Sequence, residues 1–129
     1  MMGDEPGKGD KMNELNALDA LRDKLRAFAD ERDWDQFHSP KNISMALAVE
    51  ASELLEHFQW LTEAQSHNLS SEKREAVAQE IADVLLYLVR IADKLDINLL
   101  EAANKKLVLN AGKYPAEKAR GNNKKYTEL

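Results

Sequence analysis

Two pairs of carboxylates, each pair spaced three residues apart, could do chemistry in this chain. One pair is Glu50 and Glu53, and the other is Glu80 and Asp83. In an α-helix, residues three apart lie on neighbouring turns of one face, with Cβ atoms about 5–6 Å apart. Like charges at that distance repel, so carboxylates that converge in a half-buried site must be neutralised by protons or by cations.

The sequence offers oxygen ligands for such a cation and few softer ones. It contains no cysteine, and its histidines, His38, His57 and His67, show no repeated spacing with the acids. Carboxylate oxygens are preferred by Mg²⁺ or Mn²⁺, and the Glu-x-x-His elements of di-iron bundles are absent. The carboxylates therefore predict a hard-cation site. The alternative is an acidic helix face that contacts only solvent.

Long helices are expected to position these carboxylates, because glycine and proline are nearly absent from the middle of the chain. Apolar residues recur at spacings of three and four over residues 12–32, which predicts a first helix. Ser39 and Pro40 form an N-cap signal that begins a second helix, predicted to end near Leu61. A polar loop or loose turn is expected over 62–71.

A third helix is predicted over residues 72–95, and a fourth begins with the cap residue Asn98 and closes near Gly112. Glu50 and Glu80 border the apolar stripes of the second and third helices, so they should meet in the seam. Residues 84–89 are apolar all round, and such a helix must be covered on every side. We expect it at the centre of a homo-oligomeric bundle; the alternative is the central helix of a monomeric four-helix bundle.

The length of 129 residues fits one all-α domain of four main helices. We predict a disordered N-terminal tail over residues 1–11, a helical domain over 12–115, and a C-terminal tail over 116–129 that is extended or partly mobile. No apolar run reaches the length of a membrane span, and the first residues lack the pattern of a signal peptide. With the absence of cysteine, these features predict a cytoplasmic protein.

The acidic surplus bears on the partners. The chain has 23 acidic and 18 basic residues, a net charge of −5, whereas a nucleic-acid binder needs a basic face for the phosphates. Neither a nucleic-acid polymer nor a membrane is an expected partner. Phosphates of a small ligand can still bind where a cation intervenes.

Large flat side chains lie near the carboxylates in the sequence. Trp34 and His38 precede the second helix, Trp60 lies near its predicted end, and Tyr87 follows Asp83 by one turn. A nucleobase can stack on tryptophan. The alternative for these residues is packing in a core or an interface.

Several segments resemble the MazG-like all-α nucleoside triphosphate pyrophosphohydrolases. The segments that carry this resemblance, in this order, are residues 50–53 (EASE), 58–60 (FQW) and 80–87 (EIADVLLY). Residues 31–38 (ERDWDQFH) and 113–115 (KYP) are similar to the dCTP pyrophosphatase branch of that family. The resemblance extends over residues 28–129.

The resemblance implies a homodimer or homotetramer that hydrolyses a (deoxy)nucleoside triphosphate, dCTP or a modified dCTP, to the monophosphate and pyrophosphate. It implies Mg²⁺ as cofactor, with Mn²⁺ as a possible substitute, and a house-cleaning role in the nucleotide pool. The implied metal ligands are Glu50, Glu53, Glu80 and Asp83. The implied contacts to base, sugar or phosphates are Trp34, His38, Trp60, Tyr87, Lys106 and Asn110. We choose Glu53 to orient or deprotonate the attacking water, because it lies on the side of Trp60 and away from the core.

Two alternatives stay open. The first is a non-enzymatic helical oligomerisation or interaction module, whose acidic strip would be exposed and would bind a basic partner. The second is a phosphoribosyl-ATP pyrophosphohydrolase, which would share the helical carboxylates. The two tryptophans and residues 31–38 disfavour that second alternative.

Overall fold

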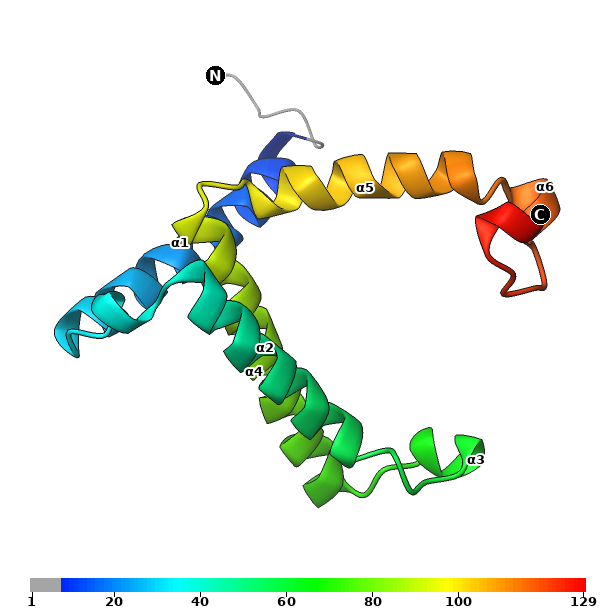
Figure 1. The fold of residues 1–129 in the computed structure, drawn as a ribbon, viewed down its shortest axis with the longest axis horizontal. Helices are drawn as coiled ribbons and strands as arrows, with labels where there is room; N and C mark the ends of the chain where they lie inside the picture. The colour runs from blue at the N-terminus through cyan, green and yellow to red at the C-terminus, as the bar shows by residue number, and fades with distance from the viewer. Residues whose placement is uncertain (1–7) are drawn as a thin grey trace. The chain divides into compact units, whose positions relative to one another are not determined.

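The computed structural model describes residues 8–129, which are helical and contain no strand (Figure 1). Four helices have 15 or more residues: α1 (Lys8–Glu31), α2 (Pro40–Glu56), α4 (Ser71–Lys94) and α5 (Leu99–Lys113). Between and after them lie two four-residue helices, α3 (Glu63–Ser66) and α6 (Ala116–Ala119), and two short 3-10 turns, η1 (Asp35–Phe37) and η2 (Tyr126–Glu128). The all-α class is confirmed, and in this part of the chain the α-helices number six rather than four.

The chain divides into two compact units between Asp96 and Ile97. The first unit contains α1, α2, α3 and α4, and the second contains α5 and α6. The helical domain predicted over residues 12–115 spans parts of both units, and its boundaries stay a prediction.

The first unit is built on α2 and α4, which lie side by side and run in opposite directions (Figure 1). Helix α1 packs against α4 as well. The core among the described residues is small and apolar, and it draws on all three helices. Its members are Ala29, Ile43, Val77, Val89 and Ala92.

The predicted starts of the second, third and fourth helices are confirmed by their caps. The Ser39 hydroxyl accepts a hydrogen bond from the backbone N–H of Asn42 (3.1 Å) at the start of α2. Ser70 and Asn98 do the same for α4 and α5. These bonds satisfy N–H groups that have no partner within the helix.

Other predicted boundaries were wrong. Helix α2 ends at Glu56 rather than near Leu61, and residues 57–60 form a turn. The predicted loop over 62–71 contains α3, whose start is stabilised by a capping box between Thr62 and Gln65.

The predicted tails also differ from the structure. The C-terminal tail contains α6 and η2. Helix α1 begins at Lys8 rather than near residue 12, while the rest of the predicted N-terminal tail, residues 1–7, lies outside the described residues.

One face of α4 stays exposed. Ile81, Leu85 and Leu88 belong to the predicted apolar stripe of this helix, yet they are 53%, 41% and 36% exposed. Val77 and Ala92, the first and last members of the same stripe, are buried, as is Val89. Helices α1 and α2 are the helices that contact α4 most. Separately, none of the helices within residues 8–129 is both long enough and apolar enough to cross a membrane.

Candidate metal centre

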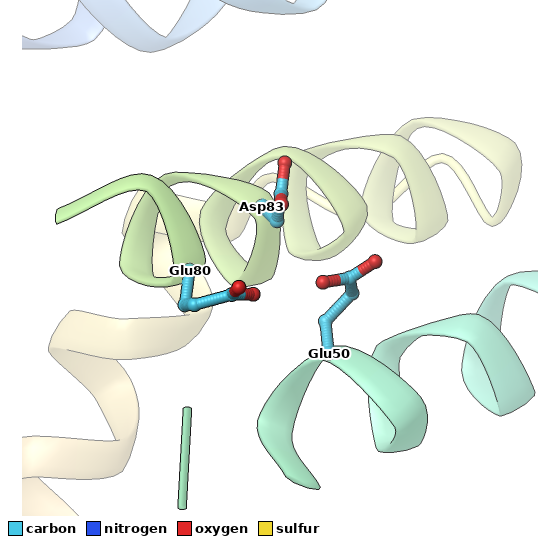
Figure 2. Close-up of side chains that lie close together, drawn as sticks. All are labelled: Glu50, Glu80 and Asp83. Carbon is cyan, nitrogen blue, oxygen red and sulfur yellow. The ribbon is translucent and has the colours of Figure 1, made fainter. Parts of the chain in front are cut away.

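Helices α2 and α4 bring three of the four predicted carboxylates together. Glu50 comes from α2, and Glu80 and Asp83 come from α4, with their carboxylates turned toward one another (Figure 2). One oxygen from each residue lies within 4.8 Å of the others, and each residue is half-buried. The predicted meeting of the two helix faces is therefore present for these three residues.

Glu53 lies one turn after Glu50 on α2 and is also half-buried. It is not a member of the group of three that could share one ion. It is nevertheless close enough to raise the pKa values of both Glu50 and Glu80. Its predicted roles, as a ligand and as the residue that acts on water, stay predictions.

Two oxygens of this cluster are buried without a partner. They are Oε2 of Glu50 and Oε2 of Glu80, neither of which accepts a hydrogen bond. The nearest basic side chain is His57, whose Nε2 lies 4.0 Å from Oε1 of Glu80. A buried acceptor without a partner costs about 1–3 kcal/mol, and more when it is charged. A cation among these oxygens would remove that cost.

The electrostatics of the cluster agree with the geometry. Burial, followed by the nearby carboxylates of Glu53, Asp83 and Glu80, raises the pKa of Glu50 to about 7. Burial and then the charge of Glu53 raise the pKa of Glu80. Without a cation, protons compete for these sites near neutral pH. The all-oxygen donor set fits a hard divalent cation such as Mg²⁺ or Mn²⁺.

Carboxylates near the C-terminal end of α4 have cationic partners. The guanidinium of Arg90 donates to Oδ1 of Asp35 (2.8 Å), which also pairs with Lys94. The guanidinium of Arg26 donates to Oδ2 of Asp93 (2.8 Å). Hydrogen bonds from these cations lower the pKa values of both aspartates.

Trp34 and His38 lie together at this end, just before α2. Asp33 adopts a left-handed conformation (φ 53°) that ends α1, and the Trp34 N–H then donates to the carbonyl of Ala29 (2.9 Å). The ring of Trp34 meets that of His38 edge to face, with centroids 6.4 Å apart. Nδ1 of His38 accepts a hydrogen bond from Nε of Arg90 (3.1 Å).

Trp60 lies beyond the opposite end of α2. It belongs to the turn that follows the helix, and it is 86% exposed. A helix of 17 residues is about 25 Å long, so a single chain keeps Trp60 far from His38. The structure therefore does not bring the predicted base contacts together within one chain.

The remaining predicted contacts divide between the two units. Tyr87 lies on α4, one turn after Asp83, and is half-buried. Lys106 is exposed and Asn110 is half-buried on α5, in the second unit. Their roles toward sugar or phosphates stay predictions.

Sequence reasoning missed Arg90 and its partners. Arg90 is 6% exposed and contacts residues more than 50 positions earlier in the chain. The available signal was a cation directly after the apolar segment 84–89, followed three residues later by Asp93. That pattern is typical of an ion pair on one helix, but it does not identify the distant partners.

Comparisons with known proteins agree on one family. Residues 45–129 match the model of the MazG-like family. The chain is 42% identical to human dCTP pyrophosphatase 1 over 114 residues, which cover 87% of the chain and 67% of the human protein. The rat protein of the same name is 40% identical over the same length.

A solved structure also matches. It is the crystal structure of a pyrophosphatase from Archaeoglobus fulgidus, with a TM-score of 0.70 and 33% sequence identity. The match covers 89% of this chain and 98% of the archaeal chain.

Proposed function

Because the chain belongs to the MazG-like family and is a nucleoside triphosphate pyrophosphohydrolase, we propose that its substrate is dCTP or a modified dCTP. Its products are then the monophosphate and pyrophosphate, and its cofactor is Mg²⁺, which Mn²⁺ can replace. Its role is to clear surplus or modified nucleotides, and its predicted location is the cytoplasm. The substrate follows the named relatives, dCTP pyrophosphatases of human and rat.

The observation that carries the metal dependence is the pair of buried oxygens without partners on Glu50 and Glu80. With Asp83 they form a three-carboxylate set from two packed helices. These three residues would hold the ion. Bound there, Mg²⁺ supplies positive charge that offsets the charge of the triphosphate and of the leaving pyrophosphate.

The chain's own residues then perform the remaining tasks. Glu53 lies beside the set of three without belonging to it, so its carboxylate is available to accept a proton from water. That water attacks the α-phosphorus, and the bond from the α-phosphorus to the bridging oxygen of the pyrophosphate breaks. Trp34 offers a ring on which the base can stack.

The interaction-module alternative expects exposed carboxylates. Glu50 and Glu80 instead each bury an oxygen that lacks a partner, which favours a bound cation over a basic protein surface. A basic protein surface would also have to reach a half-buried seam between α2 and α4.

A panel of deoxynucleoside triphosphates with Mg²⁺, with products separated by chromatography, tests the function. We expect monophosphate and pyrophosphate in equal amounts, with dCTP or a modified dCTP giving the highest kcat/KM. Stepwise release of single phosphates would contradict the proposed reaction. A different preferred base would contradict the proposed substrate.

The role of Glu53 has a matched control on the same helix. Glu53→Gln should keep the fold and lower kcat, because an amide cannot accept the proton from water. Glu56 is exposed one turn later on α2, so Glu56→Gln should leave kcat unchanged. Equal turnover by the two variants would remove Glu53 from the mechanism.

The proposed assembly is a homodimer or homotetramer. The exposed face of Ile81, Leu85 and Leu88 on α4 offers an apolar surface for a second copy. The separation of His38 and Trp60 supports the same proposal, because two copies packed in opposite directions can bring the two ends together. We expect light scattering to give a mass of two or four chains, and Leu85→Lys to lower it. A wild-type monomer at micromolar concentration would contradict this assembly.

A further inference from the structure

Arg90 is a buried charged residue that the proposed reaction does not use. Its side chain is 7% exposed, and its acceptors lie on the segment before α2 and on α4 itself. The guanidinium donates to Asp35 through one terminal nitrogen (2.8 Å) and lies 3.6 Å from Asp93 through the other. Its Nε donates to Nδ1 of His38 (3.1 Å). Arg90 therefore contacts the segment before α2, which holds both His38 and Trp34.

The direction of the bond to His38 follows from chemistry. All the nitrogen atoms of an arginine side chain act as donors, and arginine stays charged in proteins. Nδ1 of His38 must therefore present a lone pair. A neutral imidazole with a lone pair on Nδ1 carries its proton on Nε2.

We propose that Arg90 is a positioning residue that fixes His38 as a neutral imidazole protonated on Nε2, so that His38 presents a hydrogen-bond donor to the nucleotide. The identity of the ligand rests on the proposed function. The protonated nitrogen rests only on the contact with Arg90.

The surroundings of His38 oppose the charged form. Protonation of Nδ1 would place an N–H against the N–H of Arg90 and a second cation beside the guanidinium. Burial, followed by the charges of Arg90 and Lys94, lowers the pKa of His38, and the carboxylate of Asp35 opposes them only in part.

The guanidinium is held so that it cannot easily turn away. Asp35, which accepts from it, is itself paired with Lys94. Asp93, on the other side, is paired with Arg26 of α1. Arg90 keeps its Nε toward His38 because its two terminal nitrogens face these two carboxylates directly.

This tautomer limits what His38 can recognise. Its Nε2–H can donate to a carbonyl oxygen or to an unprotonated ring nitrogen of a base, and it cannot accept from an exocyclic amino group. Trp34 lies next to the imidazole, with ring centroids 6.4 Å apart, and supplies a surface for the same base to stack on. His38 is thereby a fixed donor at the base end of the site.

Nitrogen-15 NMR of histidine-labelled wild-type protein at pH 7.5 tests the assignment without any nucleotide. His38→Gln identifies the signals of His38 among the three histidines of the chain. We expect an unprotonated Nδ1 and a protonated Nε2. A proton on Nδ1, a mixture of the two tautomers, or a doubly protonated ring would overturn the proposal.

Two substitutions separate the hydrogen bond from the charge. Arg90→Met removes the donor and should give a mixture of tautomers, whereas Lys94→Met removes a nearby charge that makes no hydrogen bond to His38 and should keep the wild-type tautomer. Should Arg90→Met fail to fold, Asp35→Asn loosens the guanidinium and should give a partial mixture. A wild-type tautomer that persists in folded Arg90→Met or in folded Asp35→Asn would overturn the role of Arg90.

Kinetics then test the consequence for binding. Loss of the fixed donor should raise KM for the preferred nucleotide by up to about tenfold, with kcat changed far less. An unchanged KM in folded Arg90→Met would overturn the link to the nucleotide. A protein that turns over no nucleotide would contradict the proposed function, and the NMR result would still decide the tautomer.

Discussion

Two groups of carboxylates on and beside α4 have opposite surroundings. Near the middle of the helix, at the carboxylate cluster, Glu80 meets Glu50 across the seam, and each buries an oxygen that has no partner. Near the end, Asp93 is paired with Arg26, and Asp35 is paired with Arg90 and Lys94. The pKa values shift accordingly, upward for Glu50 and Glu80 and downward for Asp35 and Asp93.

This contrast separates acidic residues that stabilise the fold through ion pairs from acidic residues that are available to bind a ligand. Around Asp35 and Asp93, basic side chains of α1 and α4 form stabilising ion pairs. At the carboxylate cluster, the side chains that the structure describes include no basic group within 4.0 Å apart from His57. A stabilising role does not explain a half-buried cluster of like charges, whereas a cation site does.

Removing one carboxylate from the carboxylate cluster should have the largest effect. We expect Glu80→Gln to lower kcat/KM by at least about 100-fold. Substituting a residue that only hydrogen-bonds a metal ligand already lowers metal affinity or activity by about 10–100-fold. The same change removes a buried, unpaired charge, so the metal-free protein should melt at a higher temperature.

The control for that change lies on the same helix. Glu75 is exposed on α4, so Glu75→Gln should leave both the activity and the melting temperature near the wild-type values. A Glu80→Gln protein with full activity, or with a lower melting temperature in the absence of metal, would contradict the distinction between the carboxylate cluster and the ion pairs around Arg90.

Removing one of the aspartates that form ion pairs around Arg90 should have the opposite effect on stability. Asp93→Asn leaves Arg90 and Arg26 without their shared acceptor. We expect the free energy of unfolding to fall by about 2 kcal/mol, less than for a fully buried pair because Arg26 is half exposed. Urea denaturation measures this loss.

An exposed ion pair provides the comparison. Lys105 and Glu101 of α5 pair at 2.8 Å with both side chains exposed. Glu101→Gln should leave the free energy of unfolding almost unchanged, because solvent screens an exposed pair. Equal losses for Asp93→Asn and Glu101→Gln would mean that the cluster around Arg90 contributes no special stability.

The contributions of the carboxylate cluster and of the ion pairs around Arg90 to stability should also depend on pH with opposite signs, although the effect is smaller. The folded-state pKa of Glu50 is about 7, above the ordinary value of 4.5, so the metal-free protein loses stability as the pH rises from about 4.5 to about 7. The pKa values of Asp35 and Asp93 are lowered from 3.8, so their contribution is present above that value and is lost as the pH falls below it.

Thermal melting of the metal-free protein between pH 3 and pH 9 checks both signs. We expect a maximum on the acid side of neutrality, and added Mg²⁺ should remove the decline at higher pH. A melting temperature that keeps rising from about pH 5 to about pH 7 without metal would contradict the upward shift at Glu50.

The sequence predicted that Glu50, Glu80 and Asp83 lie together because the signals for this are local. Spacings of three residues place Glu50 and Glu53, and Glu80 and Asp83, on single helix faces. The caps at Ser39, Ser70 and Asn98 act within four residues. The meeting of Glu50 with Glu80 needed only the further assumption that the two apolar stripes pack together.

The contacts of Arg90 were missed because they are not local. His38 and Asp35 are more than 50 residues from Arg90 in the chain, and no periodicity links them. The end of α2 was also missed. Phe58 and Leu61 continue its apolar period, and no glycine or proline marks the stop, yet the chain turns after Glu56. Trp60 consequently lies off the helix on which the sequence had placed it.

Calorimetric titration of Mn²⁺ into the metal-free protein at pH 7.5 tests most directly whether the seam between α2 and α4 is a cation site. We expect wild-type protein and Glu75→Gln to bind Mn²⁺ alike, with release of protons from the cluster, and Glu80→Gln to bind far more weakly. Equal binding by wild-type protein and Glu80→Gln, or no binding by wild-type protein, would contradict a metal centre formed by Glu50, Glu80 and Asp83.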